Sequence, residues 1–390
     1  MKEQIRLQED ADRRANWKRW GPYLPDRQWA TVREDYSAQG NAWQSFGHEM
    51  AQSRTYRWGE DGLLGLCDRQ CRLCFSIALW NHQDPYLKER LFGLTGPEGN
   101  HGEDVKECYF FLDSTPTHSY FRALYKYPQR EFPYDELRQV NAQRTRLQPE
   151  YELYDSQAFE DDAYFDCHLE YAKAAPDDIL IRCSLTNRGK RKAPVSLLPT
   201  SWFRNTWGWG REGEDYCQRP KISLHQDGGL LLEHEQLGRF RFWVEGAQHW
   251  LFTENESNFE RLYSSKNPQP YVKDAFHRRV VQGDQGAVNP QQVGTKAAAW
   301  LEVELDAGES VEFRFRLCAE SLAPAQPFGR NFDLEMARRL SEADEFYRHH
   351  APVELESEQG LVWRQALAGL FWSKKFYYYS VAEWLEGDPS

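Results

Sequence analysis

The feature that most constrains the fold is a run near the C-terminus that is apolar around its whole circumference. If residues 358–386 form one helix, large apolar side chains fall on every side of it rather than along one stripe. These side chains, between Leu361 and Leu385, are Trp363, Leu367, Leu370, Phe371, Trp372, Phe376, Tyr377, Tyr378, Tyr379, Val381 and Trp384. Such a helix must be buried on nearly every side, because a bare one would expose a larger apolar patch than monomers tolerate.

Two explanations of this helix stay open. The sequence stops at Ser390, and it contains few other apolar helices that could cover a second face. We therefore expect this to be the N-terminal part of a longer protein whose later helices complete the burial. In the alternative, the helix docks into a groove of the preceding domain or forms a dimer seam.

Most of the chain before residue 320 is predicted to be β-structure. Strand-like runs occur at 72–80, 107–114, 164–174, 178–189 and 193–203. Two further stretches, 228–246 and 297–320, each indicate a pair of strands joined by a turn, the second turn at 306–308. Because no βαβ alternation is visible, the predicted architecture is mainly β, a large antiparallel sandwich.

Helices are predicted at both ends of this sandwich. Residues 3–19 indicate a charged helix, and a connector with Pro and Gly follows residue 320. Asp333 is the expected N-cap of the next helix, which shows apolar residues at helical spacing. The expected divisions are therefore a β-domain over 1–325, a linker helix over 333–350, and the apolar helix within 356–390.

Composition narrows the classes of partner and cofactor. The net charge of −12 argues against binding nucleic acid or anionic lipid. There is no apolar run long enough to cross a membrane and no apolar signal segment at the charged N-terminus, so we expect a cytoplasmic chain. Cys67, Cys71 and Cys74 suggest a zinc spacing, but they lie in a strand-like run without a second CxxC pair. We predict no metal and no cofactor.

Glycine followed by two carboxylates is the most distinctive loop motif. The triplet Gly-Glu-Asp occurs at 59–61, 102–104 and 213–215. Glycine lets such a loop turn tightly and direct its acids into a cleft, although the same residues are common in solvated turns. A cation site is a further alternative. The substrate-binding candidates in the first two loops are Trp58, Glu60, Asp61, Asn100, His101, Glu103 and Asp104.

Tryptophans in the run "SWFRNTWGWG" at 201–210 form a second set of candidates. An indole can stack on the apolar C–H face of a sugar while nearby carboxylates bind its hydroxyls. Trp207 and Trp209 are the candidates for this role, and Trp202 is as readily a core residue. No phosphate loop, nucleophile elbow or H-E-x-x-H motif is present, so no catalytic residue is assigned.

Six long segments, rich in tryptophan, glycine and acids, resemble the bacterial branch of the glycoside hydrolases related to processing α-glucosidase, the mannosyl-oligosaccharide glucosidase family. They are "KRWGPYLPDRQWATVREDYS" (18–37), "YRWGEDG" (56–62), "LKERLFGLTGPEGNHGEDVKE" (87–107), "LYKYPQREFPYDEL" (124–137), "PTSWFRNTWGWG" (199–210) and "RQALAGLFWSKKFYYY" (364–379). The resemblance implies a β-super-sandwich, a linker helix and the first helix of an (α/α)6 barrel that is otherwise missing.

The resemblance also implies where the chemistry lies. Members of the family invert the anomeric centre with an acid and a base that both sit in the barrel, so this chain is not expected to hold the catalytic pair. The implied role is to shape one wall of an oligosaccharide site and to dock the barrel. The alternative is a self-sufficient β-sandwich module that binds carbohydrate or a protein without catalysis.

Overall fold

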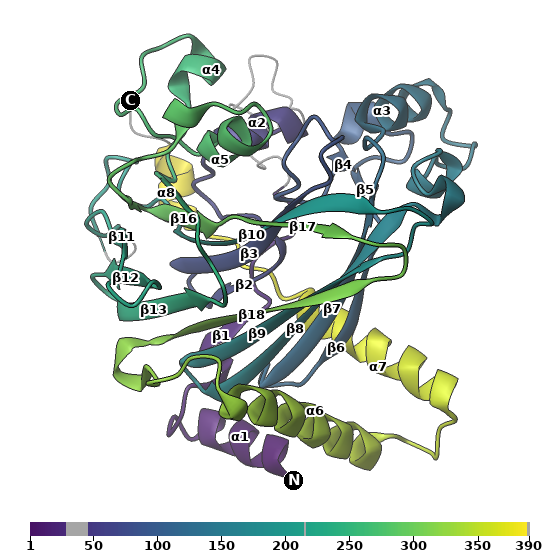
Figure 1. The fold of residues 1–390 in the computed structure, drawn as a ribbon, viewed down its shortest axis with the longest axis vertical. Coiled ribbons are helices and arrows are strands. Elements are labelled where there is room, and N and C mark those ends of the chain that lie inside the picture. The colour runs from purple at the N-terminus through teal and green to yellow at the C-terminus, as the bar shows by residue number, and fades with distance from the viewer. Residues whose placement is uncertain (29–45, 214–215, 388–390) are drawn as a thin grey trace.

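Two large antiparallel sheets face each other in the computed structural model, which describes residues 1–28, 46–213 and 216–387 (Figure 1). Part of the segment 18–37, the acids Glu214 and Asp215 of the third Gly-Glu-Asp triplet, and residues 388–390 lie outside the described residues. The prediction of a mainly β chain with large antiparallel sheets is confirmed. None of the helices in the described ranges combines the length and the apolar character needed to cross a bilayer.

The first sheet has seven strands and the second has nine. The first runs β1 (Trp20–Gly21), β2 (Leu63–Asp68), β3 (Leu73–Trp80), β10 (Ala193–Phe203), β16 (Lys296–Ala299) and β14 (Trp250–Thr253), with β17 (Leu301–Leu305) paired to β10. The second runs β15 (Val293–Gly294), β11 (Lys221–Leu224), β12 (Leu230–His234), β13 (Gly238–Val244), β18 (Ser310–Ala319), β9 (Asp178–Asn187), β8 (Tyr164–Ala175), β7 (Tyr120–Pro128) and β6 (Tyr109–Ser114). A separate ribbon joins β4 (Gly93–Leu94) to β5 (Asp104–Val105).

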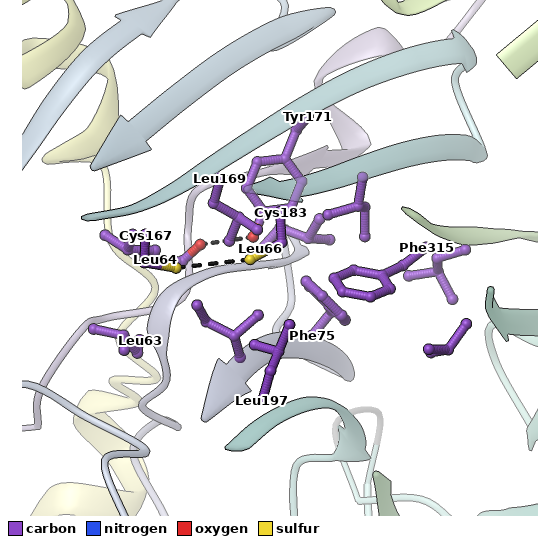
Figure 2. Close-up of a cluster of buried hydrophobic side chains, with 14 of the residues drawn as sticks. Leu63, Leu64, Leu66, Phe75, Cys167, Leu169, Tyr171, Cys183, Leu197 and Phe315 are labelled. Atoms are coloured by element: carbon purple, nitrogen blue, oxygen red, sulfur yellow. Dashed lines mark hydrogen bonds between the residues drawn. The ribbon is translucent and has the colours of Figure 1, made fainter. Parts of the chain in front are cut away.

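The core lies between the two sheets and is apolar (Figure 2). Alternate residues of the long strands point into it, so that Phe75 of β3 meets Tyr171 of β8 and Phe315 of β18. The Tyr171 hydroxyl donates to the Leu64 carbonyl at 2.7 Å, which satisfies the one polar atom of that ring inside the core. Period-two alternation therefore explains why most strand positions were predictable.

One predicted pair of strands is present but is not a hairpin. The stretch 297–320 does contain two strands and the turn at 306–308, but β17 and β18 do not form a hairpin. Leu301 of β17 pairs with Leu197 of β10, whereas Ser310 of β18 pairs with Thr186 of β9 in the other sheet. The turn carries the chain from one sheet to the other, and a local turn signal does not distinguish these two geometries.

Helices cover the outer face of the larger sheet and one end of the sandwich. Helix α6 (Arg330–His350) packs on β8, and α1 (Lys2–Ala11) packs on α6 (Figure 1). The predicted linker helix is thus present but begins three residues early, because Asp333 does not cap it and instead forms ion pairs with Arg182 and Arg314. Shorter helices are α2 (His48–Ser53), α3 (Tyr134–Gln143), α4 (Phe259–Tyr263) and α5 (Ala275–Val280).

The expected single helix over 358–386 is wrong in one respect. Helix α7 (Ser357–Trp372) ends before an extended segment, and a short helix α8 (Val381–Glu386) follows. The backbone N–H groups of Phe376 and Tyr378 donate to the carbonyls of Tyr23 and Trp58, both at 2.7 Å. These bonds to distant carbonyls replace helical bonds in an aromatic run whose helix propensity is low.

The apolar helix is nevertheless incompletely covered, as its composition predicted. Trp372 is fully buried, stacks on Phe111 at 4.6 Å between ring centroids, and donates its indole N–H to the Asp113 carbonyl at 3.1 Å. Val362 and Leu370 of the same helix are 70% and 65% exposed. The expected barrel around this helix stays a proposal.

Trp372→Ala should lower the free energy of unfolding by about 3–5 kcal/mol, because it removes a fully buried indole and leaves a cavity against Phe111. Leu370→Ala on the same helix is the matched control and should cost less than about 0.5 kcal/mol, since Leu370 is exposed. Urea denaturation of both variants measures the difference. Equal losses would show that α7 is not anchored by Trp372.

Candidate functional site

The loop at 96–104 brings three of the predicted residues to one pocket. Asn100, His101 and Glu103 line a pocket of about 680 Å³ together with Gly96, Gly99, Gly102 and Arg146. The loop begins with a capping box between Thr95 and Glu98 and bends at Gly102, whose φ of 104° is in the region that favours glycine. The local turn chemistry thus produces a concave loop, and substrate binding by this loop stays a prediction.

Asn100 presents an unsatisfied acceptor at this pocket. Its side-chain NH₂ donates to the carbonyls of Thr145 and Gln148 at 3.1 and 3.0 Å, which fixes the orientation of the amide. The opposite atom, Oδ1, is buried and has no hydrogen-bond partner among the described residues, and the residue as a whole is 8% exposed. A buried acceptor without a partner is costly, so the site favours a ligand that donates a hydrogen bond.

Glu103 supplies a second acceptor of the same kind. Its Oε1 atom is also buried and accepts no hydrogen bond from the part of the chain that the structure describes. Burial raises the pKa of Glu103 to about 7, and the charge of Arg27 opposes this shift. Glu103 is therefore protonated in part of the molecules at neutral pH, and it can accept or donate a hydrogen bond.

His101 and Asp104 anchor the loop rather than face the pocket with free groups. The His101 ring nitrogens lie 2.9 Å from a Glu150 carboxylate oxygen and 3.0 Å from the Arg146 carbonyl. Asp104 accepts from the buried ammonium of Lys106 at 2.6 Å, and Lys106 also donates to Glu150 and Glu152. Asp104, Glu150 and Glu152 are close enough to hold a metal ion, but Lys106 already supplies the positive charge there.

A second cleft, which we call the aromatic cleft, lies beside this pocket and was not predicted. It has a volume of about 420 Å³ and combines aromatic rings with charged groups. Val105, two residues after Glu103, lines it, and so does Arg27, whose charge acts on Glu103. Its other lining residues are Pro25, Asp26, Arg27, Gln28, Leu91, Tyr109, Phe111, Trp372, Ser373, Lys375, Phe376 and Tyr377.

The charged groups of this cleft belong to a connected network. Arg27 is buried, and burial lowers its pKa to about 10 while the charges of Asp61, Glu98 and Glu103 act in the opposite direction. Asp26 accepts from Lys375 at 2.9 Å and from the Leu64 N–H at 2.9 Å. No local sequence pattern links residues 26–27 with 103 and 375, so only the fold reveals this site.

Glu60 and Asp61, predicted as substrate contacts, lie inside the protein. Asp61 pairs with Arg90, whose Nε lies 3.1 Å from both carboxylate oxygens. Glu60 accepts from the indole N–H of Trp202 at 3.1 Å and from Asn255 at 2.7 Å. Both acids therefore have structural partners in this arrangement. Trp202 is a core residue, which was the alternative to sugar contact that the sequence left open for it.

Glu60 has a raised pKa because it is buried. Burial raises the pKa to about 7, and the charge of Lys273 opposes the shift without a direct contact in the described residues. Glu60 lines a closed space of about 10 Å³ shared with Lys273, Lys296 and Glu89. That volume is close to the smallest that holds one water molecule.

Trp58 packs against the C-terminal segment. It is 2% exposed, and its ring lies 6.0 Å from that of Tyr378 at 24° between the planes. The neighbouring Arg57 binds Glu383 of α8 at 2.6 Å. The Trp58 indole has no free face for a sugar in this arrangement, because tyrosines of the chain itself cover it.

Trp207 and Trp209 are partly exposed on a turn after β10. The Trp207 indole donates to Glu256 at 2.9 Å, and the Trp209 indole donates to the Asn205 carbonyl at 2.7 Å. They do not line either hollow described above. Sugar contact by these two residues stays a prediction.

Comparison with known proteins gives one close relative. The chain is 40% identical, over 430 aligned positions that include all of it, to the uncharacterized protein YMR196W of Saccharomyces cerevisiae. It spans 39% of the length of that protein. No family model matches the chain.

Three solved structures show distant similarity to the chain. The polysaccharide lyase BACCELL_00875 has a TM-score of 0.27 at 10% identity, over 70% of this chain and 28% of that one. A candidate aldose 1-epimerase from Escherichia coli K12 has a TM-score of 0.25 at 11% identity, over 54% of this chain and 68% of that one. A candidate kojibiose phosphorylase from the human microbiome has a TM-score of 0.29 at 9% identity, over 91% of this chain and 39% of that one. All three are named for activities on carbohydrates, but TM-scores this low carry no argument about function.

Lys106→Met should destabilise the protein by roughly 2 kcal/mol, because three carboxylates lose their shared cation while keeping part of their hydration. Added Ca²⁺ should restore much of the lost melting temperature in the variant and change the wild type little. Differential scanning fluorimetry with and without Ca²⁺ measures both effects. Equal stabilisation of wild type and variant by Ca²⁺ would contradict the role given to Lys106.

Glu60→Gln should reduce the pH dependence of stability. Because the folded state binds the Glu60 proton more tightly than the unfolded state, this proton stabilises the fold below pH 4.5, and the stabilisation is lost as the pH rises through 7. The wild type should therefore lose up to about 3 kcal/mol relative to the variant between pH 5 and pH 8. Urea titrations at both pH values test this, and parallel pH profiles would contradict it.

Proposed function

We propose that this chain is the β-sandwich part of a glucosidase-like glycoside hydrolase and forms one wall of its sugar site. The observation that carries the proposal is the pair of buried acceptors without partners, Asn100 Oδ1 and Glu103 Oε1, at one pocket. Sugar hydroxyls are abundant hydrogen-bond donors, and two neighbouring acceptors suit a vicinal pair of them.

The adjacent cleft supports the same ligand class. Tyr109, Phe111 and Tyr377 offer aromatic surface, while Asp26 and Arg27 offer polar groups at its edge. A sugar has an apolar C–H face and a polar rim, so this combination of groups suits a pyranose ring. Together the two hollows could accept adjacent units of an oligosaccharide.

Hydrolysis is proposed to need a further part of the protein. Inversion of a glycoside requires a protonated and an ionised carboxyl group roughly 6.5–9.5 Å apart across the substrate. Glu103 could be the protonated one, but Asp104 and Glu150 are bound to Lys106 and Asp61 is bound to Arg90. We therefore place the catalytic pair in a barrel domain of a longer protein, as the six segments resembling the processing α-glucosidase family imply.

The test is binding of glucosylated oligosaccharides to the purified chain by isothermal titration calorimetry. We expect saturable millimolar binding that strengthens as the pH rises through 7, because ionised Glu103 is the stronger acceptor. Glu103→Gln should weaken binding about tenfold and abolish the pH effect, since a neutral amide oxygen is a weaker acceptor than an ionised carboxylate and does not titrate. Glu358→Gln, on exposed α7, is the matched control and should bind as the wild type does.

Three results would contradict the proposal. Binding that Glu103→Gln leaves unchanged would remove the pocket from the sugar site. Glucose release by the chain alone, lost in Glu103→Gln, would place the catalysis here rather than in a barrel. Equally tight binding of a chitooligosaccharide would favour a general carbohydrate-binding module over a glucosidase wall.

A further inference from the structure

Three cysteines gather at the hairpin turn between β2 and β3, outside the two hollows described above. Cys67 and Cys74 lie opposite each other on the two strands, and Cys71 lies in the turn with a φ of 51°. The sulfurs of Cys71 and Cys74 are 3.5 Å apart, and both residues are fully buried. They belong to a small apolar cluster that is separate from the main core. A small movement would bring these two sulfurs to bonding distance.

The turn holds Cys71 in place and keeps it close to the surface. The Asp68 carboxylate accepts from the backbone N–H groups of Gln70 and Arg72 at 3.0 and 2.7 Å. The Cys71 N–H donates to the Asp68 carbonyl at 2.8 Å. Arg69 and Gln70, directly before Cys71, are exposed. Local opening of this turn, without loss of either strand, would therefore admit a small molecule to the Cys71 sulfur.

A buried cation lies next to Cys71. Arg204 is 4% exposed, and its guanidinium donates to the carbonyls of Cys71, Arg57 and Gln70 at 3.3 to 3.5 Å. No ion pair joins Arg204 to a carboxylate in the part of the chain that the structure describes. A buried charge is unfavourable unless an opposite charge lies near it. The surroundings of Arg204 therefore favour the thiolate form of Cys71.

The hydrogen bonds at the cluster distinguish its two closest thiols. Burial raises the pKa of Cys71, but hydrogen bonds from the thiols of Cys67 and Cys74 act against this effect. The charge of Arg204 and the backbone N–H of Glu60 act in the same direction as these bonds, and the pKa of Cys71 lies well below its usual range. Burial and the contacts with the other two sulfurs raise the pKa of Cys74. Cys71 is thus suited to attack, while Cys74 keeps its proton until a second step.

We propose that Cys71 and Cys74 form a redox modification site, in which a low-molecular-weight disulfide converts the two thiols reversibly into a disulfide bond. The Cys71 thiolate attacks one sulfur of the small disulfide, breaks its S–S bond and releases one thiolate. Cys74 then gives its proton to a released thiolate and displaces the second one from Cys71. Two electrons pass from the protein sulfurs to the small disulfide, which becomes two thiols.

The geometry asks for little movement in this reaction. The two sulfurs must approach from 3.5 Å to about 2.05 Å. Both cysteines belong to one turn and the start of one strand, so the two sheets need not move apart. This inference does not depend on sugar binding at the 96–104 loop.

A second pair of thiols provides an internal control. Cys167 of β8 and Cys183 of β9 have sulfurs 3.7 Å apart and are fully buried in the main core. Hydrogen bonding with Cys167 and burial raise the pKa of Cys183 well above its usual value. This pair matches the first in distance and burial but lacks a thiolate, so it should react slowly.

The test is incubation of the purified chain with glutathione disulfide, followed by alkylation of free thiols and peptide mass spectrometry. The bond between Cys71 and Cys74 should form at least about tenfold faster than a bond between Cys167 and Cys183, and dithiothreitol should reverse it. In a double variant, Cys67→Ser with Cys74→Ser, glutathione should stay attached to Cys71, because neither neighbouring thiol can displace it.

Substitution of the cation tests why Cys71 reacts. Arg204→Gln should slow the oxidation about tenfold, since the thiolate loses the charge beside it. The melting temperature shows whether this variant is folded, and the comparison of the two pairs in the wild type decides the inference where it is not. Equal rates for the two pairs, or no oxidation of either, would overturn the inference. So would attachment of glutathione to Cys74 in Cys71→Ser as fast as to Cys71 in the double variant.

Discussion

The carboxylate of Asp26 joins three parts of the chain that are far apart in sequence. One of its oxygens accepts from the Leu64 N–H of β2, and the other accepts from the Lys375 ammonium after α7. Lys375 in turn donates to the carbonyls of Pro22 and Leu24. The aromatic cleft exists because this contact holds the N-terminal loop, the edge of the first sheet and the C-terminal segment together. Asp26 is also a lining residue of that cleft, so structure and site depend on the same group.

Local sequence pattern predicted what depends on local geometry. Most long strands of the sandwich, but not β2 or β7, were predicted because alternation and turn residues act within a few positions. The crossing between β17 and β18, the end of α7 at Trp372 and the partners of Asp26 were not found. Each depends on a group more than a hundred positions away, such as Thr186 for Ser310 or Tyr23 for Phe376.

The carboxylates near the candidate site divide into two classes. Three acids form ion pairs: Asp61 with Arg90, Glu89 with Lys296, and Asp104 with Lys106. Their charges are balanced by these cations, and the acids stabilise the fold. Glu60 and Glu103 lack a directly bound cation among the described residues, and burial raises the pKa of both to about 7. The two acids differ in their access to a ligand. Each oxygen of Glu60 accepts a hydrogen bond from a neutral donor inside the protein, whereas one oxygen of Glu103, a residue that lines a pocket, has no partner among the described residues. Of the two, only Glu103 is placed to meet a ligand.

The proposed sugar wall and the proposed barrel domain meet on one element. Trp372 at the C-terminal end of α7 lines the aromatic cleft, and Leu370, two residues earlier, is exposed on the other side of the helix. A barrel domain that covers the exposed side of α7 would lie next to the cleft, where the proposal needs a second wall of the site. The contacts of α7 with Phe111 and Asp113 fix both sides of the helix, so docking of that domain and completion of the sugar site would be coupled through α7.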